Sequence, residues 1–224
     1  MRIAARAGVV LSIMLIASMG WAVTADAAER VAKKLPPVPA EEYPIYDLVV
    51  RSKYLVSGTT LVLIERLTVA QDEQDERAFL SREFFEEQNV FGGQLPDALL
   101  DDFFFKLKEP SRVESKFGFG VQYRFFSRGV PEEPEVSLAP VPAARLPRSV
   151  QDAPKTIGVL QFSRVGFTPR EDQALVYVEE NRPDGAGGGL LVRLHRRGKV
   201  WTITDTEVLW VAGTDEPGEE LESP

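Results

Sequence analysis

The side chains that most often carry catalysis are scarce in this chain. There is one histidine, His195, and no cysteine among the 224 residues. Zinc and copper sites are built from several imidazole or thiolate ligands, so we predict no metal centre. The sequence places no nucleophile or carboxylate beside His195, and we interpret it as a surface residue of a strand. We therefore predict no catalytic residue, no metal and no cofactor.

Carboxylates are the remaining residue type that could perform acid–base chemistry. Adjacent acids occur at 86–87, 101–102 and 179–180. Neighbouring residues of a helix do not face each other, and neighbouring residues of a strand point to opposite faces. A pair suited to glycoside hydrolysis would have to come from distant segments. A hydrolase that uses carboxylates from separate strands is therefore kept as an alternative.

Aromatic side chains offer a candidate site for binding. Three consecutive phenylalanines lie in the clearest predicted helix, 96–108, whose apolar residues recur at helical spacing. Three adjacent rings span too wide an arc for one contact face. Either the whole helix is deeply buried, which is the interpretation we favour, or one ring is exposed for binding. The candidate binding residues are Phe103, Phe104, Phe105, Tyr123 and Tyr177.

A sheet is predicted to position these residues. Four strands with short connections between residues 156 and 212 favour an antiparallel meander, since parallel pairing needs a long crossover. In the strand predicted at 173–180, the even-numbered residues point to one face and the odd-numbered residues to the other. This period of two is typical of a half-buried strand. A further strand is predicted at 116–128, with five apolar or aromatic side chains on one face.

The first half of the domain is predicted to be rich in helices. Helical spacing of apolar residues marks 43–55, 79–88 and 96–108, and a continuous apolar run predicts a buried strand at 59–69. We expect these helices to cover one face of the sheet. The fold class is therefore α+β, with N-terminal helices packed on an antiparallel β-meander. A cystatin-like curved sheet is one candidate by analogy of fold.

The beginning of the chain predicts export. Residues 1–27 have a basic start, an apolar core and a small-x-small pattern at 25–27, as in a cleaved signal peptide. An uncleaved anchor is the alternative. We favour cleavage because the apolar core is shorter than the roughly 20 residues of a spanning helix. No later stretch could cross a bilayer, and no cysteine is available for lipidation or disulfides. We expect a soluble protein in the periplasm or outside the cell.

Composition divides the rest of the chain. Residues 28–42 form a proline-containing leader that we expect to be extended or disordered. Residues 43–212 are long enough for a single domain with its own core. Within it, 129–154 holds six prolines without periodicity and is predicted to be a linker or a long surface loop. Residues 213–224 form an acidic tail that we expect to be disordered.

The C-terminal strands carry a resemblance to a known group of proteins. SRVGF at 163–167, ALVYV at 174–178, a glycine-rich loop, LLVRL at 190–194 and GKVWTI at 198–203 resemble part of a family of uncharacterised, predicted secreted bacterial proteins. The glycine-rich loop of that family carries cysteines, whereas this chain has none. The resemblance implies export and a fold of this type, and it implies no activity.

Net charge limits the choice of partners. The chain has 26 basic and 34 acidic residues and a formal net charge of −8, which argues against nucleic acid and anionic lipid as partners. Our leading hypothesis is a non-catalytic periplasmic module that binds a protein or an envelope component. The contact would be the apolar concave side of the sheet or the Phe103–Phe105 region. The alternatives are a carrier of a small apolar ligand, held against the aromatic face of the sheet, and the hydrolase.

Overall fold

The computed structural model describes residues 35–71, 78–127, 130–132 and 156–213. These residues form an α+β fold in which helices pack on a mixed sheet of eight strands, in agreement with the predicted α+β class. The predicted signal peptide, most of the predicted loop at 129–154 and nearly all of the predicted tail lie outside the described residues.

Parallel and antiparallel pairs combine in this sheet. Its strands are β1 (Leu61–Glu65), β2 (Gln122–Ser127), β3 (Val130–Pro131), β4 (Thr156–Phe162), β5 (Gly166–Phe167), β6 (Gln173–Asn181), β7 (Gly187–Arg197) and β8 (Val200–Ala212). Their order is β3-β2-β1-β4-β6-β7-β8, and β5 pairs with β6 off this path. The pairs β4–β6, β6–β7 and β7–β8 are antiparallel, whereas β1 pairs in parallel with both β2 and β4.

The helices are short, and they lie within the three segments that the periodicity indicates or beside them. They are η1 (Ala40–Glu42), α2 (Tyr43–Val49), the π-helical turn η2 (Val50–Tyr54), η3 (Ala78–Leu80), α3 (Arg82–Glu87), η4 (Val90–Gly93) and α4 (Asp97–Lys106). Ser81 caps α3, because its hydroxyl accepts a hydrogen bond from the Phe84 N–H at 3.1 Å.

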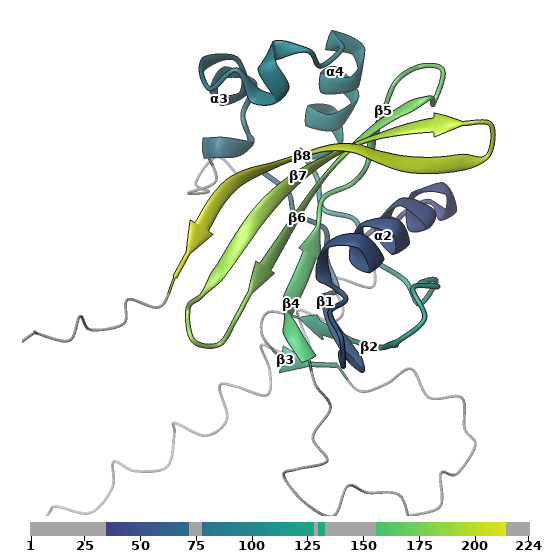
Figure 1. The fold of residues 1–224 in the computed structure, drawn as a ribbon, viewed down its shortest axis with the longest axis vertical. Helices are drawn as coiled ribbons and strands as arrows, with labels where there is room; N and C mark the ends of the chain where they lie inside the picture. The colour runs from purple at the N-terminus through teal and green to yellow at the C-terminus, as the bar shows by residue number, and fades with distance from the viewer. Residues whose placement is uncertain (1–34, 72–77, 128–129, 133–155, 214–224) are drawn as a thin grey trace, which may run out of the picture. The chain divides into compact units, whose positions relative to one another are not determined.

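Helices cover both faces of the sheet (Figure 1). Val176 and Val178 of β6 pack in a first core together with α2, and Leu175 and Tyr177 pack in a second core together with α3 and α4. The side chains of β6 therefore alternate between the two faces of the sheet, as predicted. The expectation that the helices share one face is wrong, because the long crossover from β1 to β2 carries α3 and α4 to the face opposite α2.

The end of the predicted leader belongs to the folded body. Val38 and Glu42 are each only 1% exposed, and the Val38 N–H donates a hydrogen bond to the Arg112 carbonyl at 2.9 Å. Val38 and Glu42 therefore anchor this end of the predicted leader to the fold, so it is not a disordered spacer.

Two glycines allow neighbouring elements to approach closely. A Cβ atom on Gly166 would lie 2.6 Å from the Cβ and 2.8 Å from the Cα of Phe103, so α4 rests directly on β5. A Cβ atom on Gly189 of β7 would collide with the indole of Trp210 and lie 2.5 Å from the Tyr177 hydroxyl. At both positions a larger residue would force the backbone or a ring to move.

An ion pair connects Arg66, directly after β1, to Glu132, directly after β3. Arg66 is 5% exposed, and its Nε donates to Glu132 at 2.7 Å while its guanidinium lies 3.6 Å from the centre of the Phe125 ring. Burial raises the pKa of the Glu132 carboxyl, but hydrogen bonds from Arg66 and Ser127 outweigh that effect and hold the pKa below its ordinary value of 4.5.

Replacing Glu132 with glutamine is expected to lower the free energy of unfolding at pH 7 by about 1–3 kcal/mol, because a buried guanidinium loses its charged acceptor. The pKa of this carboxyl is lower in the folded than in the unfolded chain, so its contribution is present above about pH 4.5 and disappears as the pH falls through the folded value. Urea unfolding at pH 7 and pH 3 should show the variant converging on the parent at low pH. Glu86→Gln, at an exposed position, is the control, and an equal deficit at both pH values would contradict the prediction.

Candidate functional site

A pocket of about 450 Å³ lies beside β5, and we call it the β5 pocket. Its wall is contributed by η1, α4, β5 with the residues on either side of it, and the ends of β7 and β8 at their hairpin. Three basic groups, four carboxylates and two rings line it, namely Lys106, Arg164, Arg196, Glu41, Glu42, Asp102, Glu171, Phe167 and Trp201. Charged and aromatic side chains thus dominate the wall.

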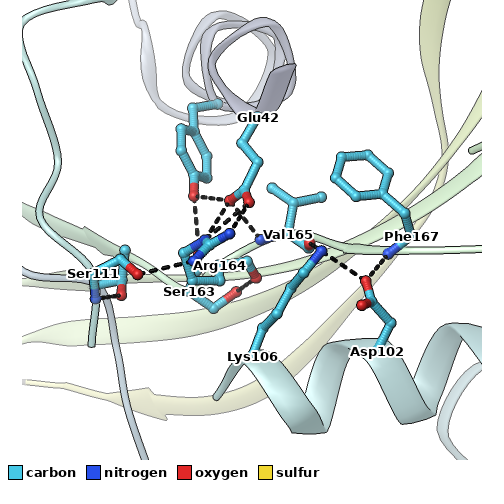
Figure 2. A network of polar contacts seen from close by, with 10 residues as sticks. Glu42, Asp102, Lys106, Ser111, Ser163, Arg164, Val165 and Phe167 are labelled. Atoms are coloured by element: carbon cyan, nitrogen blue, oxygen red, sulfur yellow. Dashed lines mark hydrogen bonds and ion pairs between the residues drawn. The ribbon is translucent and has the colours of Figure 1, made fainter. Parts of the chain in front are cut away.

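A buried carboxylate organises one side of the pocket (Figure 2). Glu42 accepts hydrogen bonds from Nε and Nη2 of Arg164, the shortest contacts measuring 2.9 and 2.7 Å. It also accepts from the Val165 N–H and the Tyr46 hydroxyl, both at 2.9 Å. Burial, and then the nearby Glu42 charge, raise the pKa of Tyr46 well above its ordinary value, so this hydroxyl stays a donor.

A second carboxylate holds β5 from the side of α4 (Figure 2). Asp102 accepts a hydrogen bond from the Phe167 N–H at 2.7 Å and forms an ion pair with Lys106 at 2.8 Å. Lys106 is four residues further along α4, a spacing that places both side chains on one helical face. Its amino group also donates to the Val165 carbonyl at 2.9 Å. The backbone from Val165 to Phe167 is therefore held by Glu42 at one end and by Asp102 at the other.

A third pair of opposite charges lines the pocket, and the remaining carboxylate, Glu41, is exposed. Arg196 lies 3.6 Å from Glu171, and its guanidinium lies 5.3 Å from the centre of the Trp201 ring. Three of the four carboxylates on the wall thus face a basic side chain. The pocket offers hydrogen-bond donors and acceptors held in fixed pairs, and it does not present the free pair of carboxylates that hydrolysis of a glycosidic bond uses.

The three consecutive phenylalanines of α4 have three different environments. Phe103 is fully buried in the second core, Phe104 is half-buried, and Phe105 is 68% exposed. The favoured interpretation, deep burial of the whole helix, is wrong for Phe105. Only one face of α4 lies on the sheet, so the third ring projects into solvent.

The two candidate tyrosines lie in different cores. Tyr177 is fully buried, and its hydroxyl donates to Glu179 at 2.9 Å and accepts from Nε1 of Trp210 at 2.6 Å. Tyr123 is half-buried in the first core, where its ring centre lies 5.2 Å from that of Phe117. The five candidate binding residues therefore form no common surface, and none of them lines the β5 pocket.

The aromatic face of the sheet is occupied. Tyr46 of α2 packs on Phe162 of β4 with 4.8 Å between the ring centres, and the strand predicted at 116–128 adds further rings to the same core. The β5 pocket was not predicted from the sequence, because the side chains on its wall come from segments that are far apart in the chain. One residue could have indicated a polar site here. Arg164 is a charged residue that lies between the apolar residues of two strands.

Comparisons with known proteins add no information on this site. No family model matches the chain, and no curated protein or solved structure matches it. In the described part of the chain, no group of three or more acidic or histidine side chains could hold a metal ion. None of the helices in the described residues is long and apolar enough to cross a membrane.

Proposed function

We propose that the chain is an exported, non-catalytic binding protein for a component of the cell envelope, and that the β5 pocket is the contact site. Export rests on the sequence of residues 1–27. Binding rests on one observation: the pocket is present in the folded chain, with six of its seven charged side chains in ion pairs and two rings on its wall.

An uncharged ligand rich in hydroxyl groups suits this wall best. A hydroxyl can both accept from a basic group and donate to a carboxylate. Arg164 directs three of its five N–H groups to Glu42 and Ser111, and Lys106 directs two of its three to Asp102 and Val165, so donors remain beyond these contacts. A charged ligand would instead compete with the existing ion pairs.

The aromatic part of the wall supports the same choice. Phe167 and Trp201 lie with their ring centres 5.9 Å apart. The Lys106 amino group lies 4.9 Å from the centre of the Phe167 ring and the Arg196 guanidinium 5.3 Å from that of Trp201, so rings and basic groups adjoin on the wall. A sugar ring has an apolar face and a polar rim, which matches a wall of this composition. We therefore infer that the bound component is a sugar unit of an envelope glycan.

The alternative functions have less support. A carrier of an apolar ligand would need space against the aromatic face, which α2 fills in the described residues. A hydrolase with its acids in this pocket would need a pair of free carboxylates, whereas three of the four on the wall are paired with Arg164, Lys106 and Arg196. The packing of α2 on the antiparallel strands supports the cystatin-like comparison as a statement about architecture, and the proposed function does not rest on it.

Replacing Trp201 with leucine is expected to weaken sugar binding about tenfold, because the pocket loses its larger ring. Calorimetric titration of the purified chain with soluble disaccharides, with and without N-acetyl groups, measures this effect. Val200→Thr changes the exposed neighbouring residue, which is not part of the pocket wall, and should bind like the parent.

Two results would overturn the proposal. The first is the absence of heat and of tryptophan fluorescence change with every disaccharide at millimolar concentration. The second is equal affinity of the parent and the Trp201→Leu variant, which would move any sugar contact away from the β5 pocket.

A further inference from the structure

The two edges of the sheet differ in length. One edge is β3, a strand of two residues that ends in Pro131. The other edge is β8, a strand of 13 residues that pairs with β7 from end to end. Within the described residues no strand pairs with the outer side of β8. Short strands and proline protect an edge from further pairing, as at β3. β8 is long and free of proline, and its protection is limited to two bulges and two acidic residues.

The residues of β8 favour addition of another strand. Seven of its 13 residues are β-branched, and it contains neither proline nor a basic residue. Val200, Val208 and Val211 are each more than half exposed. Shifts in its register with β7 leave Thr204 and Leu209 as bulges, and between them Asp205–Val208 is regular. We expect new pairing to centre on this regular section.

Charge makes a second copy of this chain a poor occupant. A two-fold pair of β8 strands centred on Thr206, the middle residue, would place Asp205 of each copy directly opposite Glu207 of the other. Like charges in directly opposed positions destabilise an antiparallel pair. Each copy also carries a net charge of −8. A basic residue opposite Asp205 would instead be attracted.

We propose that β8 accepts an extended segment of another polypeptide as an added strand, and that this segment carries lysine or arginine opposite Asp205 between β-branched or aromatic residues. Backbone hydrogen bonds supply affinity in this mode of binding, and alternate side chains supply specificity. The site and the class of ligand both differ from those of the β5 pocket. Only Trp201 belongs to β8 and also lines that pocket.

Selection of random decapeptides displayed on phage against the immobilised chain tests the proposal. We expect enriched peptides with a basic residue near the centre and β-branched or aromatic neighbours. Amide hydrogen exchange should show new protection at alternate residues of Asp205–Val208 when such a peptide is added as a synthetic compound. Methylation of alternate peptide nitrogens should abolish binding, because it removes the donors of the strand pairing.

Charge reversal at one exposed position provides the matched variants. Asp205→Lys is expected to weaken the selected basic peptide about five- to tenfold, and Asp205→Asn to have a smaller effect. Repeating the selection on Asp205→Lys should enrich acidic centres instead. Phe105→Ala, at an exposed site on α4, should bind the peptide like the parent.

Several outcomes would overturn the proposal. They are failure to enrich any peptide, equal binding of the methylated peptide, and protection of the β5 pocket in place of the β8 amides. Concentration-dependent self-association that protects β8 amides would assign the edge to a second copy of the chain.

Discussion

Replacing Glu42 with leucine is expected to lower the free energy of unfolding by about 3–5 kcal/mol, the usual cost of breaking a buried ion pair. Glu42 is 1% exposed and Arg164 only 15%, so the guanidinium that is left behind would be largely buried without its counter-charge. The Tyr46 hydroxyl and the Val165 N–H would lose an acceptor as well. Urea unfolding at pH 7 followed by circular dichroism measures the loss.

Two further variants distinguish the contribution of the ion pair to stability from that of the neighbouring residues. Glu41→Leu changes the adjacent exposed residue and should alter stability by no more than about 0.5 kcal/mol. The double variant Glu42→Leu, Arg164→Leu should recover part of the loss, because it removes the uncompensated charge. Equal effects of the Glu41 and Glu42 substitutions would show that the pair does not stabilise the fold.

Replacing Phe103 with alanine is expected to cost about 3–5 kcal/mol of unfolding free energy, because the side chain is fully buried and its loss leaves a cavity. Its ring lies 5.4 Å from that of Phe104 and 6.3 Å from that of Phe85, and its backbone rests on Gly166. The neighbouring positions are too tightly arranged to close the space without moving α4.

Phe105→Ala is the matched control on the same helix. Both substitutions change phenylalanine to alanine, so their effects on helix propensity are alike, and only burial differs. With a side chain that is 68% exposed, Phe105→Ala should change stability by no more than about 0.5 kcal/mol. Comparable losses for the two variants, measured by urea unfolding, would mean that α4 presents a different face to the sheet.

The parts of the fold that could be predicted are those that local periodicity determines. Alternation along β6 assigned Val176 and Tyr177 to opposite faces correctly, because side chains of a strand alternate by geometry. Helical spacing likewise located α4. Periodicity identifies the residues of a helix that are buried together, but not the face of the sheet that they cover. The distribution of helices over both faces was therefore missed.

The candidate site depends on long-range contacts and could not be predicted. Glu42 and Arg164 are 122 positions apart, and no local pattern pairs them. Tyr177 had the composition of a binding residue, but Trp210, 33 positions away, uses its hydroxyl as a buried acceptor. Residues 35–42 were assigned to a leader because proline content was the only local signal. The burial of Val38 depends on contact with a distant segment at Arg112.

The position of β6 between the two cores has a consequence for cooperativity. Leu175 and Tyr177 belong to one core and Val176 and Val178 to the other, so neither core can lose this strand without exposing the second. The two layers should therefore unfold in a single transition, and the central amides of β6 should exchange only through global unfolding. Opening one layer by displacing β6 would therefore expose the other core as well. Binding is therefore expected at surfaces that already exist in the native state.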